Sequence, residues 1–242
     1  MIKSLSIIFP VFNEELRLKS SFSHIRTFIK KKKKFKIEII FVDDGSKDKT
    51  YNLIKSFIQN FNSSNKIRIK AIRSNKNLGK GHALKLGIKK AKYDWILTTD
   101  VDMSVSLFQL PIWLKKKFIH NKFNVYFGSR THEKSIVKKD FFRNILGDIM
   151  RFFVSTVLNI KIKDTQCGYK LYKKKVAKLI FSKLKDYGFN HDLEIVLLLK
   201  QKNIKIKELP VKWIHKSDSR LNVFWDPVKM FFGIFTIKFR YF

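Results

Sequence analysis

The stretch Trp95-Ile96-Leu97-Thr98-Thr99-Asp100-Val101-Asp102 combines an apolar run with two carboxylates at its end. The apolar run predicts a buried strand, which delivers Asp100 and Asp102 to its carboxyl end. Two hard oxygen ligands spaced by one residue suit a Mg²⁺ or Mn²⁺ ion that carries a diphosphate. A second acidic pair, Asp43 and Asp44, ends another strand-like run. Acids at two strand ends predict a nucleotide–metal site at the carboxyl edge of a parallel sheet.

Strand and helix patterns alternate through the first half of the chain. The expected strands span Ser4–Phe9, Ile37–Val42, Ile67–Ile72 and Trp95–Thr99, and the helices between them Glu14–Lys31, Asp48–Phe61 and Gly81–Ala91. Later in the chain we expect strands at Val125–Gly128 and Ile204–Val211 and an amphipathic helix at Phe141–Ile160. Repeated βα units predict an α/β fold, with a Rossmann-like, mostly parallel sheet and helices on both faces.

The 242 residues suffice for one domain with a core, which we expect over residues 1–221. Residues 222–242 are expected to form an amphipathic helix, with Asp226 as its N-cap and Pro227 at its first position. From Asp226 to the end is 17 residues, fewer than the about 20 apolar residues that span a bilayer, and Lys229 and Lys238 interrupt them. We therefore expect the helix to lie in the plane of a membrane interface. Packing on the domain's own core is the alternative.

The formal net charge is +33. Abundant Lys, Ile, Asn and Phe indicate a compositional bias that explains much of the lysine excess. The lysines are scattered and form no compact motif with arginines and aromatic residues, so we expect no nucleic-acid partner. An anionic membrane surface remains a candidate partner. Nothing in the sequence predicts the oligomeric state.

Cys167 is the single cysteine, so no disulfide can form within the chain, which fits a reducing compartment. The N-terminus enters a strand-like segment without a basic-then-apolar leader, so we expect no signal peptide. Together with the C-terminal helix, this predicts a peripheral protein on the cytoplasmic face of a membrane.

Seven motifs occur in a fixed order along the chain. They are FPVFNEE at 9–15, VDDGSKDKT at 42–50, NLGKGHALKLGI at 77–88, DVD at 100–102, GSR at 128–130, DTQCGYKLY at 164–172 and NHDLEIV at 190–196. The first five resemble a family 2 glycosyltransferase with the GT-A fold. The last two narrow the resemblance to the polyprenyl-phosphate sugar transferases, and among these to the dolichyl-phosphate β-glucosyltransferases.

The resemblance implies a nucleotide pocket around the first acidic pair. Pro10, Asn13 and Glu14 would line this pocket, and Pro10 should also end the first strand because proline cannot continue a ladder. The resemblance assigns Asp43 to the base, with Asp44 shaping the turn. The alternative is an ordinary turn, since Asp-Gly-Ser is common in turns without any ligand.

The resemblance also implies a metal at the second acidic pair. Asp100 would bind the ribose or the metal, Asp102 the metal, and Ser104 could offer a further ligand. The metal, Mg²⁺ or Mn²⁺, would stabilise the leaving nucleoside diphosphate. Lys80 adds a phosphate-seeking charge to a glycine-containing loop that opens a helix.

Arg130 and Arg143 are arginines in a chain that prefers lysine. This choice favours planar, bidentate recognition of the acceptor phosphate or donor diphosphate. The resemblance implies that Asp164 orients a sugar hydroxyl or stabilises charge at the anomeric carbon. In relatives that transfer sugar to a hydroxyl, an acid near Asp192 or Glu194 acts as the base.

The function implied is inverting transfer of a hexose, best glucose from UDP-glucose, to a polyprenyl phosphate of the dolichyl type. A phosphate monoester is already largely dianionic at neutral pH, so its oxygen needs no strong general base. The alternatives are transfer from GDP-mannose to the same lipid, and transfer to a sugar hydroxyl of a polysaccharide or glycoprotein. The non-enzymatic alternative is a basic protein that binds nucleic acid or lipid surfaces.

Overall fold

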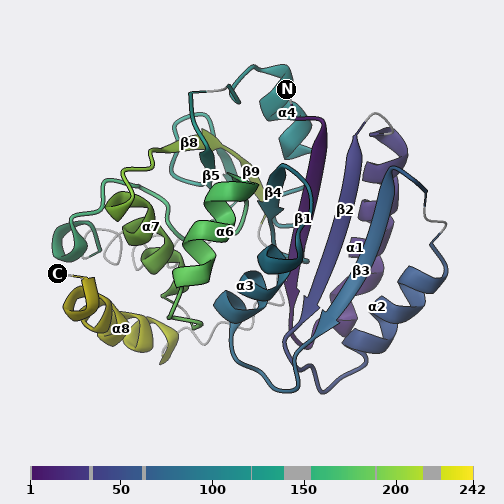
Figure 1. Cartoon of the computed structure of the whole chain (residues 1–242), viewed down its shortest axis with the longest axis horizontal. Helices are drawn as coiled ribbons and strands as arrows, with labels where there is room; N and C mark the ends of the chain where they lie inside the picture. The colour runs from purple at the N-terminus through teal and green to yellow at the C-terminus, as the bar shows by residue number, and fades with distance from the viewer. Residues whose placement is uncertain are drawn as a thin grey trace.

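The chain folds around a seven-stranded sheet in the order β3-β2-β1-β4-β7-β5-β8 (Figure 1). This computed structural model describes residues 2–32, 35–61, 64–120, 122–138, 154–188, 190–214 and 225–241. The strands are β1 (Ser4–Val11), β2 (Lys36–Asp43), β3 (Ile67–Arg73), β4 (Trp95–Thr98), β5 (Val125–Ser129), β7 (Lys170–Lys173) and β8 (Ile206–Pro210). Neighbouring strands are parallel, apart from β7, which runs antiparallel to β4 and β5.

Helices cover both faces of this sheet. They are α1 (Glu15–Lys31), α2 (Thr50–Gln59), α3 (Lys80–Lys90), α4 (Gln109–Lys115), α6 (Lys174–Lys183), α7 (His191–Gln201) and α8 (Trp225–Tyr241). Two buried clusters form the core, one on each face. The first packs α1, α2 and α4 against the sheet, and the second packs α3, α6, α7 and α8 against it. The predicted α/β architecture is confirmed.

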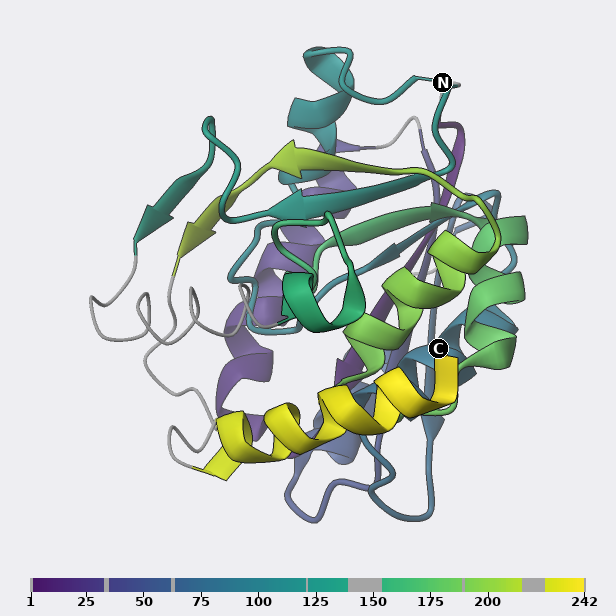
Figure 2. The ribbon, with the colours of Figure 1, turned by 90° about the vertical axis from the view of Figure 1, so that its left-hand side faces the viewer.

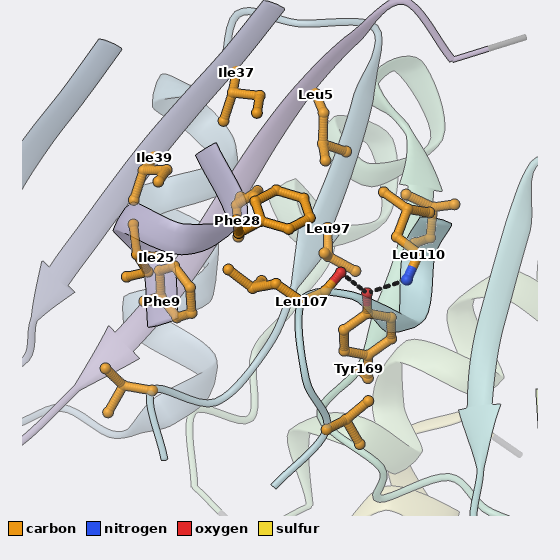
Figure 3. Close-up of a cluster of buried hydrophobic side chains, with 14 of the residues drawn as sticks. Leu5, Phe9, Ile25, Phe28, Ile37, Ile39, Leu97, Leu107, Leu110 and Tyr169 are labelled. Carbon is orange, nitrogen blue, oxygen red and sulfur yellow. Dashed lines mark hydrogen bonds between the residues drawn. The ribbon is translucent and has the colours of Figure 1, made fainter. Parts of the chain in front are cut away.

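Alternation along the strands divides the two clusters. In β1, Leu5, Ile7 and Phe9 belong to the first cluster, whereas Ile8 belongs to the second. Figure 3 shows the first cluster, where Leu5 and Phe9 lie among side chains of α1, β2 and β4. The Tyr169 hydroxyl drawn there accepts from the Leu110 N–H at 2.9 Å and donates to the Leu107 carbonyl at 3.4 Å. Burial of this phenol therefore leaves no unpaired group.

The predicted strands and helices of the first half are confirmed, with ends shifted by one or two residues. The late strand and the C-terminal helix are also present, but the helix begins at Trp225, so Asp226 lies within its first turn and is not its N-cap. The expected helix Phe141–Ile160 lies largely outside the described residues, which begin again at Val154. Sequence patterns did not predict β7, α4, α6 or the small parallel sheet formed by β6 (Ile136–Lys138) and β9 (Lys212–Ile214).

The prediction that Pro10 ends the first strand is wrong, because β1 continues to Val11. The Ile8 carbonyl accepts from the Thr99 N–H at 3.2 Å, so Ile8 faces β4. Residues two apart in a strand face the same side, so the Pro10 nitrogen also faces that side. Since β4 ends at Thr98, no ladder partner is lost there. Proline is tolerated where the neighbouring strand has ended.

Helix α8 lies against α7 (Figures 1 and 2). Ile234 and Ile237 are fully buried in the second cluster, and Gly233 lies so close to Asn190 that a β-carbon would collide with its amide. The helix is thus packed on the core along one side. Of the helices described, none is both long and apolar enough to cross a membrane.

Candidate active site

The carboxyl ends of β1, β2 and β4 meet at one edge of the sheet, where two hollows adjoin. The Asp102 hollow, of about 290 Å³, is lined by Pro10, Glu14, Arg17, Asp44, Lys80, Asp100 and Asp102 among others. The Arg73 hollow, of about 720 Å³, is lined by Ser46, Lys47, Tyr51, Arg73 and Lys76 among others. Phe12 and Asn77 line both. The edge of the sheet at which the sequence predicts a site is thus hollowed.

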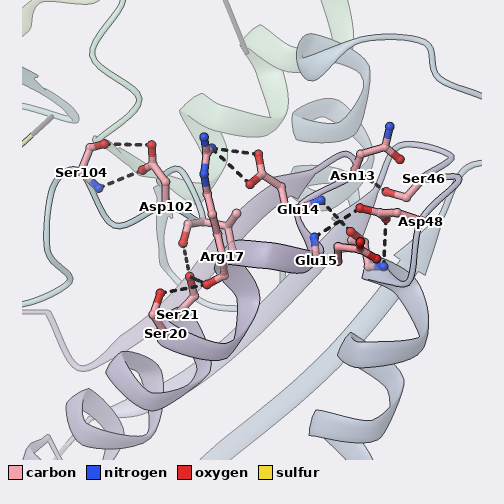
Figure 4. Close-up of polar contacts among 12 residues, drawn as sticks. Asn13, Glu14, Glu15, Arg17, Ser20, Ser21, Ser46, Asp48, Asp102 and Ser104 are labelled. Carbon is pink, nitrogen blue, oxygen red and sulfur yellow. Dashed lines mark hydrogen bonds and ion pairs between the residues drawn. The ribbon is translucent and has the colours of Figure 1, made fainter. Parts of the chain in front are cut away.

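In the Asp102 hollow, two carboxylates follow β4. Asp100 Oδ1 lies 2.6 Å from Lys80 Nζ, and both side chains are partly exposed. Asp102 accepts the Ser104 N–H and hydroxyl, each at 2.8 Å (Figure 4). Ser104 therefore holds Asp102 in one orientation, and its hydroxyl is engaged with that carboxylate. Each Asp102 oxygen keeps a lone pair for another partner.

These residues fit a hard divalent cation. Asp100 and Asp102 offer carboxylate oxygens, as Mg²⁺ and Mn²⁺ prefer, and Lys80 already places a positive charge at Asp100. Within the described ranges, no cluster of three or more His, Cys, Asp or Glu side chains forms a complete cage. An ion held by one or two carboxylates takes its other ligands from phosphate and water, which suits an open hollow.

The loop before α3 is fixed by Asp44 and Gly79. The Leu78 and Gly79 N–H groups donate to Asp44 Oδ2 at 3.1 and 2.6 Å. Gly79 has φ +107°, and a β-carbon there would collide with the Tyr187 carbonyl, so only glycine fits. This geometry places Lys80 at the hollow. Burial opposes its charge, but Asp100 and then Asp192 raise the pKa of Lys80 above its ordinary value.

The Arg73 hollow has a buried carboxylate beneath it. Asp43 is fully buried, accepts the Ser46 N–H at 3.2 Å, and lies 3.1 Å from Arg73 Nε. Arg73 also donates to the Ser46 carbonyl at 3.0 Å and lies 4.7 Å from the centre of the Tyr51 ring. Arg73 thus lines the hollow, whereas Asp43 does not, and the ion pair with Asp43 holds the Arg73 side chain in place. Asn13 ties the β1–α1 turn to this loop by accepting the Lys47 N–H at 2.8 Å.

A buried ion pair lies on the inner side of Asp100. Lys170 Nζ contacts the Asp192 carboxylate, and both line a small cavity of about 10 Å³ with Lys80 and Asp100. Burial alone would raise the pKa of Asp192, but His191, Lys170 and Lys80 lower it to about 2. Asp192 is therefore a stable anion and a weak proton acceptor.

The other predicted acids are engaged by protein partners. Glu194 is fully buried and accepts from the Lys185 and Asp186 N–H groups at 3.0 and 2.5 Å and from the Tyr241 hydroxyl. Asp164 accepts three donors of Arg130, the backbone N–H, Nε and Nη2, each at 2.8 Å.

Arg130 and Asp164 form a bidentate ion pair, in which Nε and Nη2 of the guanidinium donate to the two carboxylate oxygens. Burial alone would raise the pKa of Asp164 and lower that of Arg130, but each partner reverses the effect on the other. Neither residue is among the described lining of the two hollows. Arg130 also lies 5.9 Å from the Trp213 ring. Arg143, its predicted partner, lies outside the described residues.

Comparison with known proteins places the chain in a family. The family model "Glycosyl transferase family 2" matches residues 6–181. The chain belongs to glycosyl transferase family 2. It is 37% identical to the dolichyl-phosphate beta-glucosyltransferase of Dictyostelium discoideum, over 98% of this chain and 74% of that protein. It is 31% identical to the human protein of that name, over 99% of this chain and 76% of that one.

Solved structures confirm the GT-A fold expected for this family 2 glycosyltransferase. Glucosyl-3-phosphoglycerate synthase from Mycobacterium tuberculosis, in complex with Mn²⁺ and UDP-glucose, superposes with a TM-score of 0.68. It covers 98% of this chain and 79% of its own, at 13% identity. Mannosyl-3-phosphoglycerate synthase from Rubrobacter xylanophilus superposes with a TM-score of 0.67 at 15% identity.

In this family 2 glycosyltransferase, two arginines that line the hollows escaped the sequence analysis. Arg17 lines the Asp102 hollow and Arg73 the Arg73 hollow. The signal used for Arg130 and Arg143, arginine in a lysine-rich chain, applies equally to both. Arg17 lies three residues after Glu14 in the first motif, and Arg73 ends β3. Position directly after a predicted strand would have found Arg73, whereas Arg17 lies eight residues beyond Phe9, where the first strand was predicted to end.

Proposed function

We propose that this glycosyltransferase moves glucose from UDP-glucose to a polyprenyl phosphate of the dolichyl type, with inversion at the anomeric carbon. The observation that carries the proposal is similarity, over nearly the whole chain, to proteins named dolichyl-phosphate beta-glucosyltransferase. The adjoining hollows support it, because a nucleoside and its diphosphate need neighbouring sites of different character.

The nucleoside would occupy the Arg73 hollow and the diphosphate the Asp102 hollow. Phe12 and Tyr51 offer aromatic surface to a base, and Arg73 offers hydrogen-bond donors. In this arrangement Asp43 acts on the base through Arg73, which it orients. Glu14 and Pro10 line the Asp102 hollow beside the sugar phosphates.

Asp100 and Asp102 would hold Mg²⁺ or Mn²⁺, which neutralises the leaving diphosphate when bound. Lys80 remains charged beside Asp100 and contributes further positive potential at the leaving group. Ser104 keeps the Asp102 carboxylate oriented. The Arg130–Asp164 pair, with every Asp164 oxygen engaged, would position the loop before β7 and does not need to touch substrate.

The acceptor chemistry follows from Asp192 and Glu194. A base for a sugar hydroxyl works best with a pKa near the operating pH. Asp192, with a pKa of about 2, is far from that range, and Glu194 is buried among protein donors. A phosphate acceptor, already dianionic, needs no such base. These features favour a lipid phosphate over a sugar hydroxyl.

Membrane contact is the remaining part of the proposal. Residues 1–221 would form the catalytic domain, and residues 222–242 would rest on the cytoplasmic surface of a membrane. On α8, Ile234 and Ile237 face the core, whereas Phe232 and Phe239 are 67% and 86% exposed. Exposed phenylalanines beside basic residues favour an interfacial position. The helix would thus serve both as core packing and as membrane contact.

The test is transfer of label from UDP-glucose or GDP-mannose into organic-extractable lipid, with polyprenyl phosphate, detergent and Mg²⁺ or Mn²⁺. We expect label from UDP-glucose, lost with EDTA and in Asp102→Ala. The matched control is Glu133→Ala. It removes an exposed acid whose contact with Lys134 is 4.0 Å long. Label from GDP-mannose alone would change the donor, and donor hydrolysis without lipid product would overturn the acceptor.

A further inference from the structure

Arg17 has an orientation that an ordinary surface pair at a helix start would not require. Its guanidinium lines the Asp102 hollow, and its side chain is 16% exposed. Figure 4 shows it extending between Asp102 and Glu14. A surface pair three residues apart in a helix gains little from such burial. The position therefore needs a further explanation.

Glu14 holds this guanidinium by one corner. Arg17 Nη1 donates to both Glu14 oxygens, at 3.3 and 3.2 Å. Among the described residues, the N–H groups on Nε and Nη2 have no protein partner. A planar guanidinium with one corner fixed and another edge open is suited to bind an anion through two parallel hydrogen bonds.

A serine side chain connects the helix that carries Arg17 to the loop that carries the predicted metal ligands. One turn further along α1, the Ser21 hydroxyl contacts the Val101 carbonyl, between Asp100 and Asp102. The same hydroxyl lies 3.0 Å from the Arg17 carbonyl. The Ser21 hydroxyl therefore links the first turns of α1, which carry Arg17, to the loop after β4, which carries Asp100 and Asp102.

The charges that line the hollow show a shortage of cations. Among the lining residues that the structure describes, four acids, Glu14, Asp44, Asp100 and Asp102, face two bases, Arg17 and Lys80. Lys80 is already paired with Asp100. A divalent metal would balance the remaining acids, but a diphosphate brings further negative charge. Arg17 is the lining cation whose hydrogen-bonding edge is open to meet it.

We propose that Arg17 is a phosphate-binding residue of the Asp102 hollow, held in its binding pose by Glu14. Its ligand is a phosphoryl group, carried either by the nucleotide donor or by the lipid acceptor. The donor is the nearer source, since this hollow adjoins the Arg73 hollow at Phe12 and Asn77. This inference rests on the proposed function, which supplies both phosphates.

The test compares Arg17→Gln and Arg17→Lys with Arg26→Gln. Arg26 lies on the same helix, exposed, with its guanidinium 4.9 Å from the Phe57 ring, so its loss changes net charge equally without touching the hollow. Calorimetry measures binding of UDP and of uridine in the presence of Mg²⁺ or Mn²⁺. Lipid transfer measures KM for polyprenyl phosphate. Thermal unfolding checks that each variant is folded.

If the donor diphosphate is the ligand, Arg17→Gln weakens UDP binding by on the order of 10-fold to 100-fold and leaves uridine binding unchanged. Arg17→Lys retains part of the affinity, because the charge stays and the fork is lost. If the acceptor is the ligand, UDP binding is unchanged and KM for polyprenyl phosphate rises by a similar factor. Arg26→Gln matches wild type throughout.

Unchanged UDP affinity together with unchanged acceptor KM in Arg17→Gln overturns the proposal. Equal weakening of UDP and uridine also overturns it, because the effect then does not involve phosphate. Wild-type protein that binds UDP but transfers no glucose to polyprenyl phosphate defeats the proposed function instead. In that case, comparing UDP binding with uridine binding in Arg17→Gln still tests whether Arg17 binds phosphate.

Discussion

Replacing Lys170 by methionine should destabilise the protein by stranding a buried carboxylate. Lys170 lies in β7 with 2% of its side chain exposed, between the Asp192 carboxylate and the Phe127 ring. Methionine fills most of the volume but provides no charge. Asp192, 10% exposed, would then remain ionised in a site without its contacting cation. Breaking a buried pair in this way costs more than the pair itself contributes.

The magnitude follows from the charges around Asp192. Burial opposes its ionised form, but His191, Lys170 and Lys80 together lower its pKa from 3.8 to about 2. The whole shift corresponds to about 2 kcal/mol, but the share from His191 is lost once that ring is uncharged, so less than this remains at neutral pH. Burial also lowers the pKa of His191 below 6.5, so this ring is uncharged at pH 7 and cannot replace Lys170. Lys80 remains, so we expect the lower end of the usual range, about 3 kcal/mol.

Urea unfolding at pH 7 measures this loss, and thermal unfolding should show a midpoint lower by about 6–12 °C. Lys178→Met, the same change at an exposed position of α6, is the matched control and should stay within about 0.5 kcal/mol. The double variant Lys170→Met, Asp192→Asn should recover much of the loss, since no unpaired charge is left buried.

The pH dependence has a definite sign. A carboxyl whose pKa is lowered on folding contributes stability above its unfolded pKa, and this contribution disappears as pH falls through the folded pKa. The gap between wild type and Lys170→Met should therefore be full above about pH 4 and shrink toward pH 2. A loss below about 1 kcal/mol at pH 7, or a gap that stays constant down to pH 2, would refute the reasoning.

Three further outcomes are expected. In Gly168→Ala the new β-carbon would meet the Asp100 carboxylate at less than van der Waals distance, so Mn²⁺ affinity should fall about 10-fold while the urea midpoint hardly moves; equal Mn²⁺ binding would contradict this. Burial raises the pKa of the Cys167 thiol to about 12, so a disulfide reagent at pH 8 should label it in urea but not in the native protein, and rapid native labelling would count against the structure. Tyr241→Phe removes a donor from the buried Glu194 carboxylate and should cost about 1–3 kcal/mol in urea unfolding, whereas no change would mean that α8 is not docked there.

Acidic strand ends were readable in the sequence because their meaning is local. An apolar run followed at once by Asp100 and Asp102, or by Asp43 and Asp44, needs no knowledge of distant residues. Parallel strands then bring these ends to one edge by topology alone. The same reasoning predicted Lys80 at that edge, where it pairs with Asp100.

Charged residues inside the core were not readable. Lys170 stands in a lysine-rich run that resembles solvated surface, yet β7 is a central strand. Its burial depends on Asp192, which lies 22 residues further along the chain. The bidentate ion pair between Arg130 and Asp164 joins residues 34 apart. The acids to which the resemblance assigned roles are thus paired with distant residues, and the spacing of residues in the sequence does not reveal those pairs.

The sequence by itself determined the βα order, the acidic edge and the family motifs, because periodicity and strand-end chemistry are properties of short segments. Tertiary structure alone decided which charges are available to a ligand. In the folded chain, Asp164 and Glu194 accept hydrogen bonds from protein donors. Asp43 is buried and paired with Arg73, whereas Arg17 lines the Asp102 hollow. A side chain can bind substrate only if folding has not already satisfied it, and that depends on contacts between distant segments.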